Sequence, residues 1–304
     1  MPPLAEFFQV IVRTILPIFL IIGAAMLVAR YKTLDVRTLS RTTIYLFSPA
    51  LILNSMTTSG LGAAELGAVA LGAALFCTLM AVIGSLIARG LRYPRAIASS
   101  FVLAAFIMNS VNFGFPFIEF TFGPAGLEIA VPFFVGQVLT AYLIGTYVAS
   151  RGRSSWKVAV RNVLTLPTPY AFLLAIALNM SGTALPTPIM RATEVMGQAV
   201  VPTALVILGL QLRAARLRGL WGPILTASFT RFALGAAVAL GVAALFGWQG
   251  LTRQVFVLEA SMPAGVLSGV LATEFGGDAV YSAGIILVTT LLSVVFLSGL
   301  LLLL

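Results

Sequence analysis

Two stretches of the chain combine polar side chains with helix-breaking residues inside otherwise apolar sequence. They are MNSVNFGFPFIEF at 108–120 and LEASMPAGVLSG at 258–269. Proline removes one backbone donor and clashes with the preceding turn, so each stretch predicts an interrupted helix. An interruption frees amides just after the proline, which suit an anion, and carbonyls near Met108 and Ala260, which suit a cation. The chemistry predicted for these stretches is therefore ion binding.

Side chains within and near the interruptions add specific groups. Asn109 and Asn112 can donate and accept hydrogen bonds across a gap, and Glu259 is an acid inside apolar sequence. A charge inside a membrane is costly, so function is the default interpretation of such a residue. The candidate substrate- and ion-binding residues are Asn109, Asn112, Gly114, Pro116, Arg231, Glu259, Ser261, Met262 and Pro263, with Asn54 and Gln137 as second-tier candidates.

Each candidate also has a structural interpretation that stays open at this point. Proline kinks are common in membrane helices, and the two asparagines could serve only to bond neighbouring helices. Glu259 and Arg231 could pair with each other, which would neutralise two charges. The prolines interpreted as kinks that aid packing are Pro17, Pro49, Pro169 and Pro202.

The composition identifies the solvent in which these elements fold. Of 304 residues, 60% are hydrophobic and 9% are charged, and the mean hydropathy is +1.07. A soluble protein of this length needs far more charge to cover its surface, so the chain is predicted to be an all-α polytopic membrane protein. One cysteine and no histidine exclude a disulfide framework, a multi-cysteine metal site and a serine–histidine hydrolase. An enzyme is not expected.

The net charge of +9 is explained by membrane topology. Fourteen of the 18 lysines and arginines fall in four groups, at 30–41, 89–95, 151–161 and 213–218, which occupy every second loop. This alternation follows the positive-inside rule for cytoplasmic loops. We therefore expect a lipid bilayer and no nucleic acid as partner, a plasma (inner) membrane location, and both termini outside.

About 20 apolar residues are needed to cross a bilayer, and ten such segments can be delimited. They lie near 9–29, 38–58, 64–89, 95–121, 125–150, 160–181, 188–212, 219–247, 252–275 and 279–303.

Matching segments relate the two halves of the chain. LFSPALIL at 46–53 matches VVPTALVIL at 200–208, and FGPAG at 122–126 matches FGGDA at 275–279. In both pairs the offset is 153 residues, and a third match is one residue out of register. Three matches in order at nearly one offset indicate an internal repeat.

The matches predict two five-helix repeats, 1–153 and 154–304, with scaffold and core subdomains interleaved across both. Because five is odd, the second repeat is inverted relative to the first, which is the usual construction of secondary transporters. The fourth and ninth helices are then the broken pair and cross at mid-membrane. Interruptions at corresponding positions of inverted repeats are typical of a transport site.

Three segments in order resemble the auxin efflux carrier family of bacterial and plant transporters, in the bile acid/auxin carrier-like superfamily. They are NFGFPFIEFTFGPAGLEIA, GQAVVPTALVILGLQL and EASMPAGVLSGVLATEFGGDAVYSAGIILVTTLLS. The resemblance, which begins near Pro17, implies a ten-helix transporter with a panel-like scaffold and a core with two crossing broken helices. It implies substrates such as dicarboxylates or indole acetate-like acids. It points to Asn112, Gly114 and Pro116 in the first interruption and to Met262 and Pro263 in the second.

The sequence therefore predicts a secondary transporter for a small organic anion, working by alternating access around the crossing. Glu259 would couple transport to a proton or to a sodium ion near Asn109, Asn112 and Glu259. Half-helix amides and Arg231 would hold a substrate carboxylate. An anion channel, a membrane-embedded sensor and a sodium-coupled symporter of a bulkier organic acid are the alternatives. No cofactor is expected beyond the coupling ion, and a homodimer through the scaffold is a further expectation.

Overall fold

The computed structural model describes residues 3–150, 156–214, 220–274 and 276–304, most of which are helical. Within these ranges the extended pairing is limited to one isolated antiparallel bridge, between Met108 and Ala264. Arg151, Arg153, Arg216, Arg218 and Phe275, which contribute to the basic groups and the repeat, lie outside the described residues.

The chain forms two compact units, and each takes segments from both halves of the sequence. Unit 1 comprises Met1–Leu71, Val111–Val135 and Leu164–Ala214. Unit 2 comprises Gly72–Ser110, Gly136–Val163 and Ala215–Leu304.

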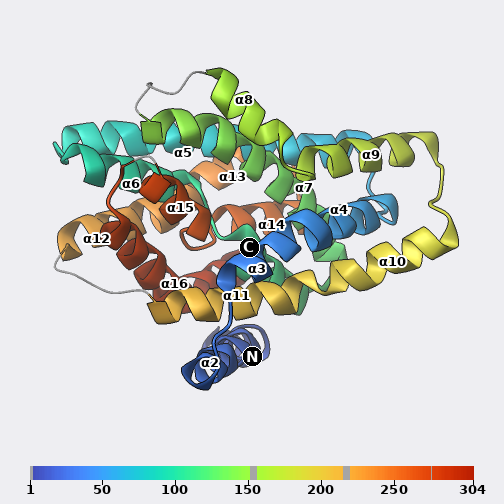
Figure 1. The fold of residues 1–304 in the computed structure, drawn as a ribbon, viewed down its shortest axis with the longest axis horizontal. Coiled ribbons are helices and arrows are strands. Elements are labelled where there is room, and N and C mark those ends of the chain that lie inside the picture. Colours follow the sequence, from blue (N-terminus) through green and yellow to red (C-terminus); the bar gives the residue numbers. More distant parts are fainter. Residues whose placement is uncertain (1–2, 151–155, 215–219, 275) are drawn as a thin grey trace. The chain divides into compact units, whose positions relative to one another are not determined.

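Within unit 1, α2 packs on α11, and α4 packs on α9 and α10 (Figure 1). A Cβ on Gly209 of α11 would lie 2.7 Å from the Ile22 carbonyl oxygen of α2, so the absence of a side chain permits this close approach. The helices are α1 (Pro3–Val10), η1 (Ile11–Ile15), α2 (Leu16–Tyr31), α3 (Val36–Thr42), η2 (Thr43–Phe47), α4 (Ser48–Thr57), α9 (Thr168–Ser181), α10 (Thr187–Gln198) and α11 (Val200–Ala214), with the first parts of α5 (Ala63–Gly90) and α7 (Phe115–Ser150).

Three prolines follow short π-helical segments. The segments η1, η2 and η3 (Ser110–Gly114) each end two residues before a proline, at Pro17, Pro49 and Pro116. Proline lacks an N–H and clashes with the carbonyl four residues back, so a locally widened turn accommodates it. Pro169 and Pro202 instead lie in the first turns of α9 and α11, where a missing N–H costs little.

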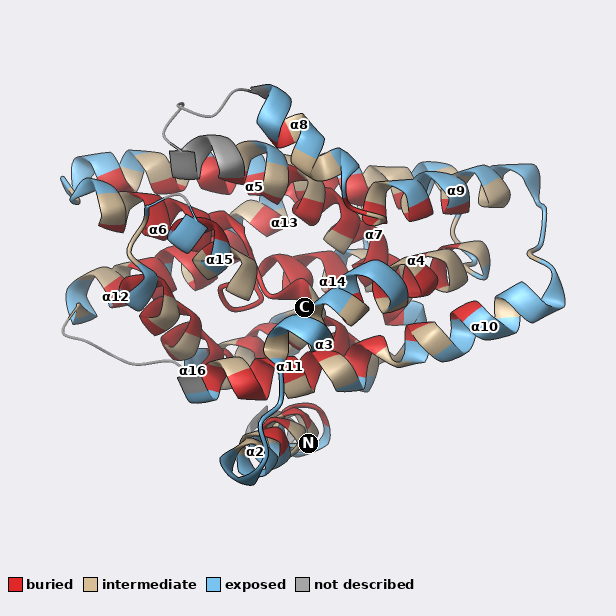
Figure 2. Cartoon of the chain, viewed as in Figure 1, coloured by how far each residue is buried: buried red, intermediate tan, exposed pale blue. Residues whose placement is uncertain are grey.

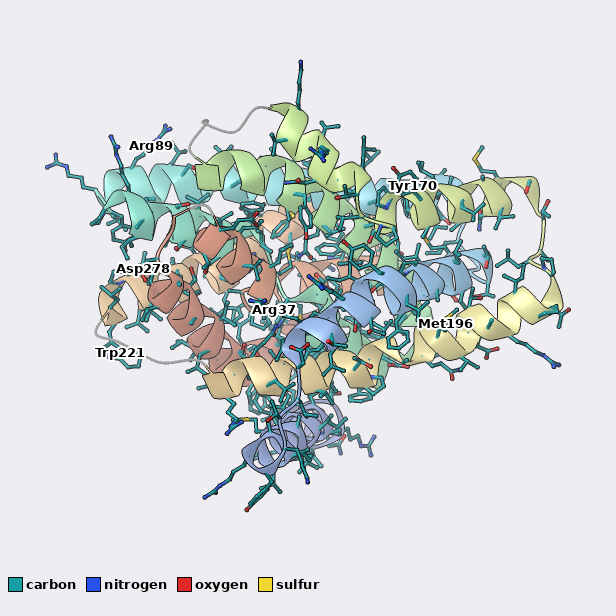
Figure 3. All side chains as sticks on the ribbon, in the orientation of Figure 1. Arg37, Arg89, Tyr170, Met196, Trp221 and Asp278 are labelled. Carbon is teal, nitrogen blue, oxygen red and sulfur yellow. The ribbon has the colours of Figure 1, made fainter. Side chains whose placement is uncertain are left out.

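Unit 2 is centred on α14 and the segment after it. Every residue from 255 to 265 is buried, and α14 is largely in the buried colour in Figure 2. Helix α16 packs on α6, α12, α14 and α15, and Asp278 caps its first turn by accepting the Tyr281 amide at 2.8 Å (Figure 3). The helices are α6 (Arg95–Phe106), α8 (Trp156–Leu164), α12 (Trp221–Phe229), η4 (Thr230–Leu234), α13 (Gly235–Leu245), α14 (Gly250–Ala260), α15 (Val266–Glu274) and α16 (Ala279–Leu303), with the later parts of α5 and α7.

Among the residues that the structure describes, six helices are long and apolar enough to cross a membrane, or seven spans if the bent pair α8 and α9 counts as one. The chain is therefore a multi-pass membrane protein. The expected spans 95–121 and 252–275 are interrupted, at 107–109 and at 261–265. The ten-span inverted arrangement stays a prediction. The six helices are Phe7–Tyr31, Ala63–Gly90, Ser110–Gly145, Thr187–Arg213, Trp221–Leu245 and Ala279–Leu303.

The expected boundary between the fourth and fifth spans, between residues 121 and 125, coincides with a break in helical geometry at Gly123. Helix α7 (Phe115–Ser150) runs across this break without an intervening loop. A straight helix of its 36 residues would be about 54 Å long, whereas the hydrocarbon core is about 30 Å thick. Gly123 resolves this mismatch, because its φ of 66° and ψ of −158° leave the helical region and divide α7 into two parts.

Candidate functional site

The first interruption lies directly after α6. The helix ends at Phe106, and Ile107 is extended, with φ −100° and ψ 105°. Helical structure resumes at Ser110 with the π-helical segment η3. The first half-helix was expected to end near Met108, and it ends two residues earlier, at Phe106.

The second interruption lies between α14 and α15. Helix α14 ends at Ala260, as expected, and α15 begins at Val266. Pro263 has no N–H to offer the Glu259 carbonyl four residues back. That carbonyl accepts the Met262 amide instead, at 3.2 Å, which closes a tighter final turn. The proline therefore ends the helical ladder where the sequence predicted.

The two interruptions pair through their backbones within unit 2. The Asn109 amide donates to the Pro263 carbonyl oxygen at 2.8 Å, and the Gly265 amide donates to the Ile107 carbonyl oxygen at 2.8 Å. An unpaired backbone group in lipid costs several kcal/mol, so non-helical backbone is tolerated where protein satisfies it. Through these two reciprocal hydrogen bonds, each interruption supplies a backbone partner to the other.

Gly265 permits this close approach. A Cβ at this position would lie 2.6 Å from the Met108 carbonyl oxygen and 2.8 Å from its carbonyl carbon. Both atoms belong to the backbone and cannot rotate away, so any side chain would force the two segments apart. A glycine often marks a site of close backbone approach, and this one, two residues after Pro263, was not singled out from the sequence.

Glu259 is fully buried beside the second interruption. The Ser110 hydroxyl is near enough to interact with its carboxyl group, but no hydrogen bond of ordinary geometry from any described residue reaches either carboxyl oxygen. Ser110 Oγ donates instead to Gln137 Oε1, and Gln137 Nε2 donates to the Met108 carbonyl oxygen at 2.7 Å. Because an isolated buried carboxylate is far more costly than a neutral polar group, Glu259 requires a proton or a bound cation.

Further buried polar groups lie in or beside the interruptions. The Ser261 hydroxyl and the side-chain nitrogen of Asn109 have no partner in the described part of the chain. The expectation of free amides just after Pro263 is wrong for the first two residues, because the Ala264 amide donates to Thr289 Oγ1 at 3.1 Å and the next amide pairs across the junction. The Glu259 carboxyl and Ser261 hydroxyl oxygens are hard ligands that suit a proton or a hard cation, whereas the Asn109 nitrogen is a hydrogen-bond donor that suits an anion.

Arg231 lies on the π-helical turn η4 and is fully buried. Its Nη1 donates to the Ala105 carbonyl oxygen at 2.6 Å, and its Nη2 donates to the Ala260 carbonyl oxygen. The guanidinium carbon lies 5.5 Å from the centre of the Phe76 ring. The alternative that Arg231 pairs with Glu259 does not hold in the described residues, where the Glu259 oxygens have no partner.

The candidates divide between the two units. Asn54 and Asn112 are half-buried, and Gly114 and Pro116 are buried, all in unit 1. Those gathered at the junction in unit 2 are Asn109, Gln137, Arg231, Glu259, Ser261, Met262 and Pro263.

Sequence reasoning missed two polar residues that contact the junction. Ser110, 1% exposed, stands between two asparagines in the first interruption, and that position was an available signal. Thr289, fully buried, precedes a second threonine in helix α16, which contains no charged residue. A polar pair in such a helix also indicates an inward-facing surface.

Known proteins with similar sequences are membrane transporters. Residues 150–301 match the family described as membrane transport protein. An uncharacterized transporter from Methanothermobacter thermautotrophicus is 30% identical over 267 residues, which cover 86% of this chain and 87% of the relative. An uncharacterized transporter from Methanocaldococcus jannaschii is 30% identical over 203 residues, which cover 65% of each chain.

Proposed function

Because the chain belongs to the membrane transport protein family, to which the auxin efflux carriers belong, we propose that it is a secondary transporter for a small organic anion. It works by alternating access around two broken helices that cross at the paired interruptions. The crossing completes a ten-helix arrangement of two inverted five-helix repeats. The two units, each taking segments from both halves of the sequence, support interleaved scaffold and core subdomains.

The observation that carries the proposal is the unpartnered carboxyl group of Glu259 beside the paired breaks. Both of its oxygens are buried without a hydrogen-bond partner in the described part of the chain. Glu259 binds the coupling ion, which is a proton or sodium, with the Ser110 and Ser261 hydroxyls as neighbouring oxygen ligands. A charged ion that enters the buried junction must be neutralised there by an opposite charge. The binding of the cation and the binding of an anionic substrate are therefore energetically linked.

Two donors in unit 2 are suited to the substrate carboxylate. Helix α15 begins at Val266, and a helix N-terminus carries partial positive charge. The Asn109 side-chain nitrogen is buried and free of any partner among the described residues, and it lies in the adjoining break. We assign Asn112, Gly114 and Pro116 to the same function on the sequence resemblance.

The basic groups set the proposed orientation. Arg37 lies in the first turn of α3 and Arg89 in the last turn of α5, and both are exposed (Figure 3). The positive-inside rule places such residues on the cytoplasmic side of the plasma (inner) membrane, with both termini outside. A homodimer through unit 1 is part of the same proposal.

Uptake into proteoliposomes tests the proposal. Purified protein is reconstituted and given labelled malonate, malate or indole-3-acetate, with a proton or sodium gradient imposed. Saturable uptake that depends on one gradient establishes an anion carrier and identifies the coupling ion. Single-channel currents in a planar bilayer, without saturable uptake, would replace the carrier with an anion channel.

A further inference from the structure

Arg231 is the sole charged residue in the apolar helical stretch Trp221–Leu245. It lies within η4, where the helix widens to a π-helical turn, and such turns are frequent at functional sites. Its side chain reaches the ends of two other helices. This placement raises the question of which negative groups balance a guanidinium at that depth.

The negative groups that balance Arg231 are carbonyl oxygens at the junction that have lost their helical hydrogen-bond donors. The Ala105 carbonyl would normally accept the amide of residue 109, but that amide donates to Pro263. The Ala260 carbonyl would normally accept the amide of residue 264, but that amide donates to Thr289. The Ala105 and Ala260 carbonyl oxygens, near the ends of the two first half-helices, therefore lack their helical donors.

Arg231 supplies both missing donors. Its Nη1 bonds the Ala105 oxygen at 2.6 Å and its Nη2 bonds the Ala260 oxygen. Each helix C-terminus carries about half a negative charge, so two C-termini together balance one guanidinium. The planar fork of arginine can serve two acceptors at fixed geometry, which an ammonium group does less well.

The surroundings fit a fixed structural cation. A Cβ on Gly235, one turn along the same helix, would lie 3.2 Å from Arg231 Nη2, so the glycine leaves room for the guanidinium. The Phe76 ring covers it at 5.5 Å. Arg231 makes no ion pair with Glu259 among the described residues, so the charge of the carboxyl group stays available for an exchangeable cation.

We propose that Arg231 is a positioning residue that joins the C-terminal ends of α6 and α14 and holds the two interruptions in register. It is not a ligand of the transported anion. The inference uses contacts within unit 2 alone, so it stands even if no organic anion is transported.

Hydrogen–deuterium exchange of the full-length protein in detergent micelles tests this role. In Arg231→Met, which removes both donors and the charge, we expect exchange of the amides at 107–109, 261–262 and 264–265 to accelerate at least tenfold. Arg231→Lys, which retains the charge, should recover part of that protection. Arg253→Met replaces an exposed arginine on α14 and should leave the junction as in the wild type.

Three outcomes would overturn the proposal. The first is unchanged exchange at the junction in Arg231→Met. The second is equal acceleration throughout the chain in both Arg231 variants, which would indicate general loss of stability. The third is restored protection in Arg231→Met combined with Glu259→Gln, because only a charge pair between the two residues would be relieved by neutralising both. We expect the double variant to exchange at the junction as fast as Arg231→Met.

Discussion

The Asn109 amide donates to the Pro263 carbonyl oxygen at 2.8 Å, so each interrupted helix completes the backbone of the other. Neither break could exist alone at membrane depth, because its amides and carbonyls would face lipid without partners. The Ala105 and Ala260 carbonyls lose their helical donors, the first to this pairing and the second to Thr289, and Arg231 replaces both. The junction is therefore one hydrogen-bonded assembly inside unit 2.

Substitution of Gly265 by alanine should force this junction apart. The added Cβ would lie 2.6 Å from the Met108 carbonyl oxygen, and overpacking of this kind typically costs about 1–3 kcal/mol. We expect a lower unfolding temperature in detergent and reduced uptake. Gly241→Ala on α13 is the matched control, because nothing lies within 4 Å of its Cβ position and alanine favours a helix. Equal stability of the two variants would contradict the close approach.

Replacement of Gln137 by leucine should leave two buried polar groups without partners. Gln137 Nε2 donates to the Met108 carbonyl oxygen at 2.7 Å, and its Oε1 accepts from Ser110. An unsatisfied buried group costs about 1–3 kcal/mol, so thermal unfolding followed by tryptophan fluorescence should show a clear loss. Gln198→Leu, on an exposed face of α10, should change little. A stable Gln137→Leu protein would show that the amide is dispensable.

The sequence predicted the interruptions better than it predicted their internal bonding. Pro263 and the end of α14 at Ala260 follow from local chemistry, because a missing N–H ends a helical ladder wherever it occurs. The role of Gly265 and the capping of Ala105 by Arg231 depend on segments more than 100 residues apart in the chain. No local pattern contains that information. The π-helical turns η1, η2 and η3 were likewise missed, since they arise from how a following proline is accommodated within the helix.

Asp35 should titrate below the usual range of an aspartate. Its carboxylate accepts hydrogen bonds from the Thr38 hydroxyl at 2.5 Å and from the backbone amides of Arg37 and Thr38. The hydrogen bond from the hydroxyl is the largest of the causes that lower the pKa of Asp35. A lowered pKa in the folded state means that the cap stabilises α3 above about pH 3.9, the unfolded value, and is lost as pH falls through the folded pKa. A carbon-13 NMR titration measures this pKa directly.

Thr38→Val tests the cause of that shift. Removal of the hydroxyl should raise the Asp35 pKa toward its ordinary value. Thr42→Val is the control. The Thr42 hydroxyl donates to the Thr38 carbonyl oxygen at 2.9 Å and not to the Asp35 carboxylate. An unchanged pKa in Thr38→Val would assign the shift to the backbone amides alone.

Cysteine labelling should place the two ends of the 95–181 region on opposite sides of the membrane. Cys77 is buried, so the native protein supplies an unreactive background for a membrane-impermeant maleimide. We expect Ala184→Cys to label in intact cells and Arg92→Cys to label only after permeabilisation, because the proposed orientation puts the basic group at 89–95 inside. Both residues are exposed. Labelling of both from one side would remove the odd number of crossings that the ten-span arrangement requires between them.

Glu259→Gln should separate ion coupling from folding. Glutamine keeps the shape of the side chain but cannot carry a charge or release a proton, so a buried group without partners loses its need for a cation. We therefore expect an unfolding temperature equal to or above that of the wild type, together with loss of gradient-driven uptake in proteoliposomes. Glu274→Gln neutralises an exposed carboxylate at the end of α15 and should retain both properties. Uptake by Glu259→Gln with unchanged pH and sodium dependence would exclude this carboxyl group from coupling, and the ion would then have to bind elsewhere in the chain.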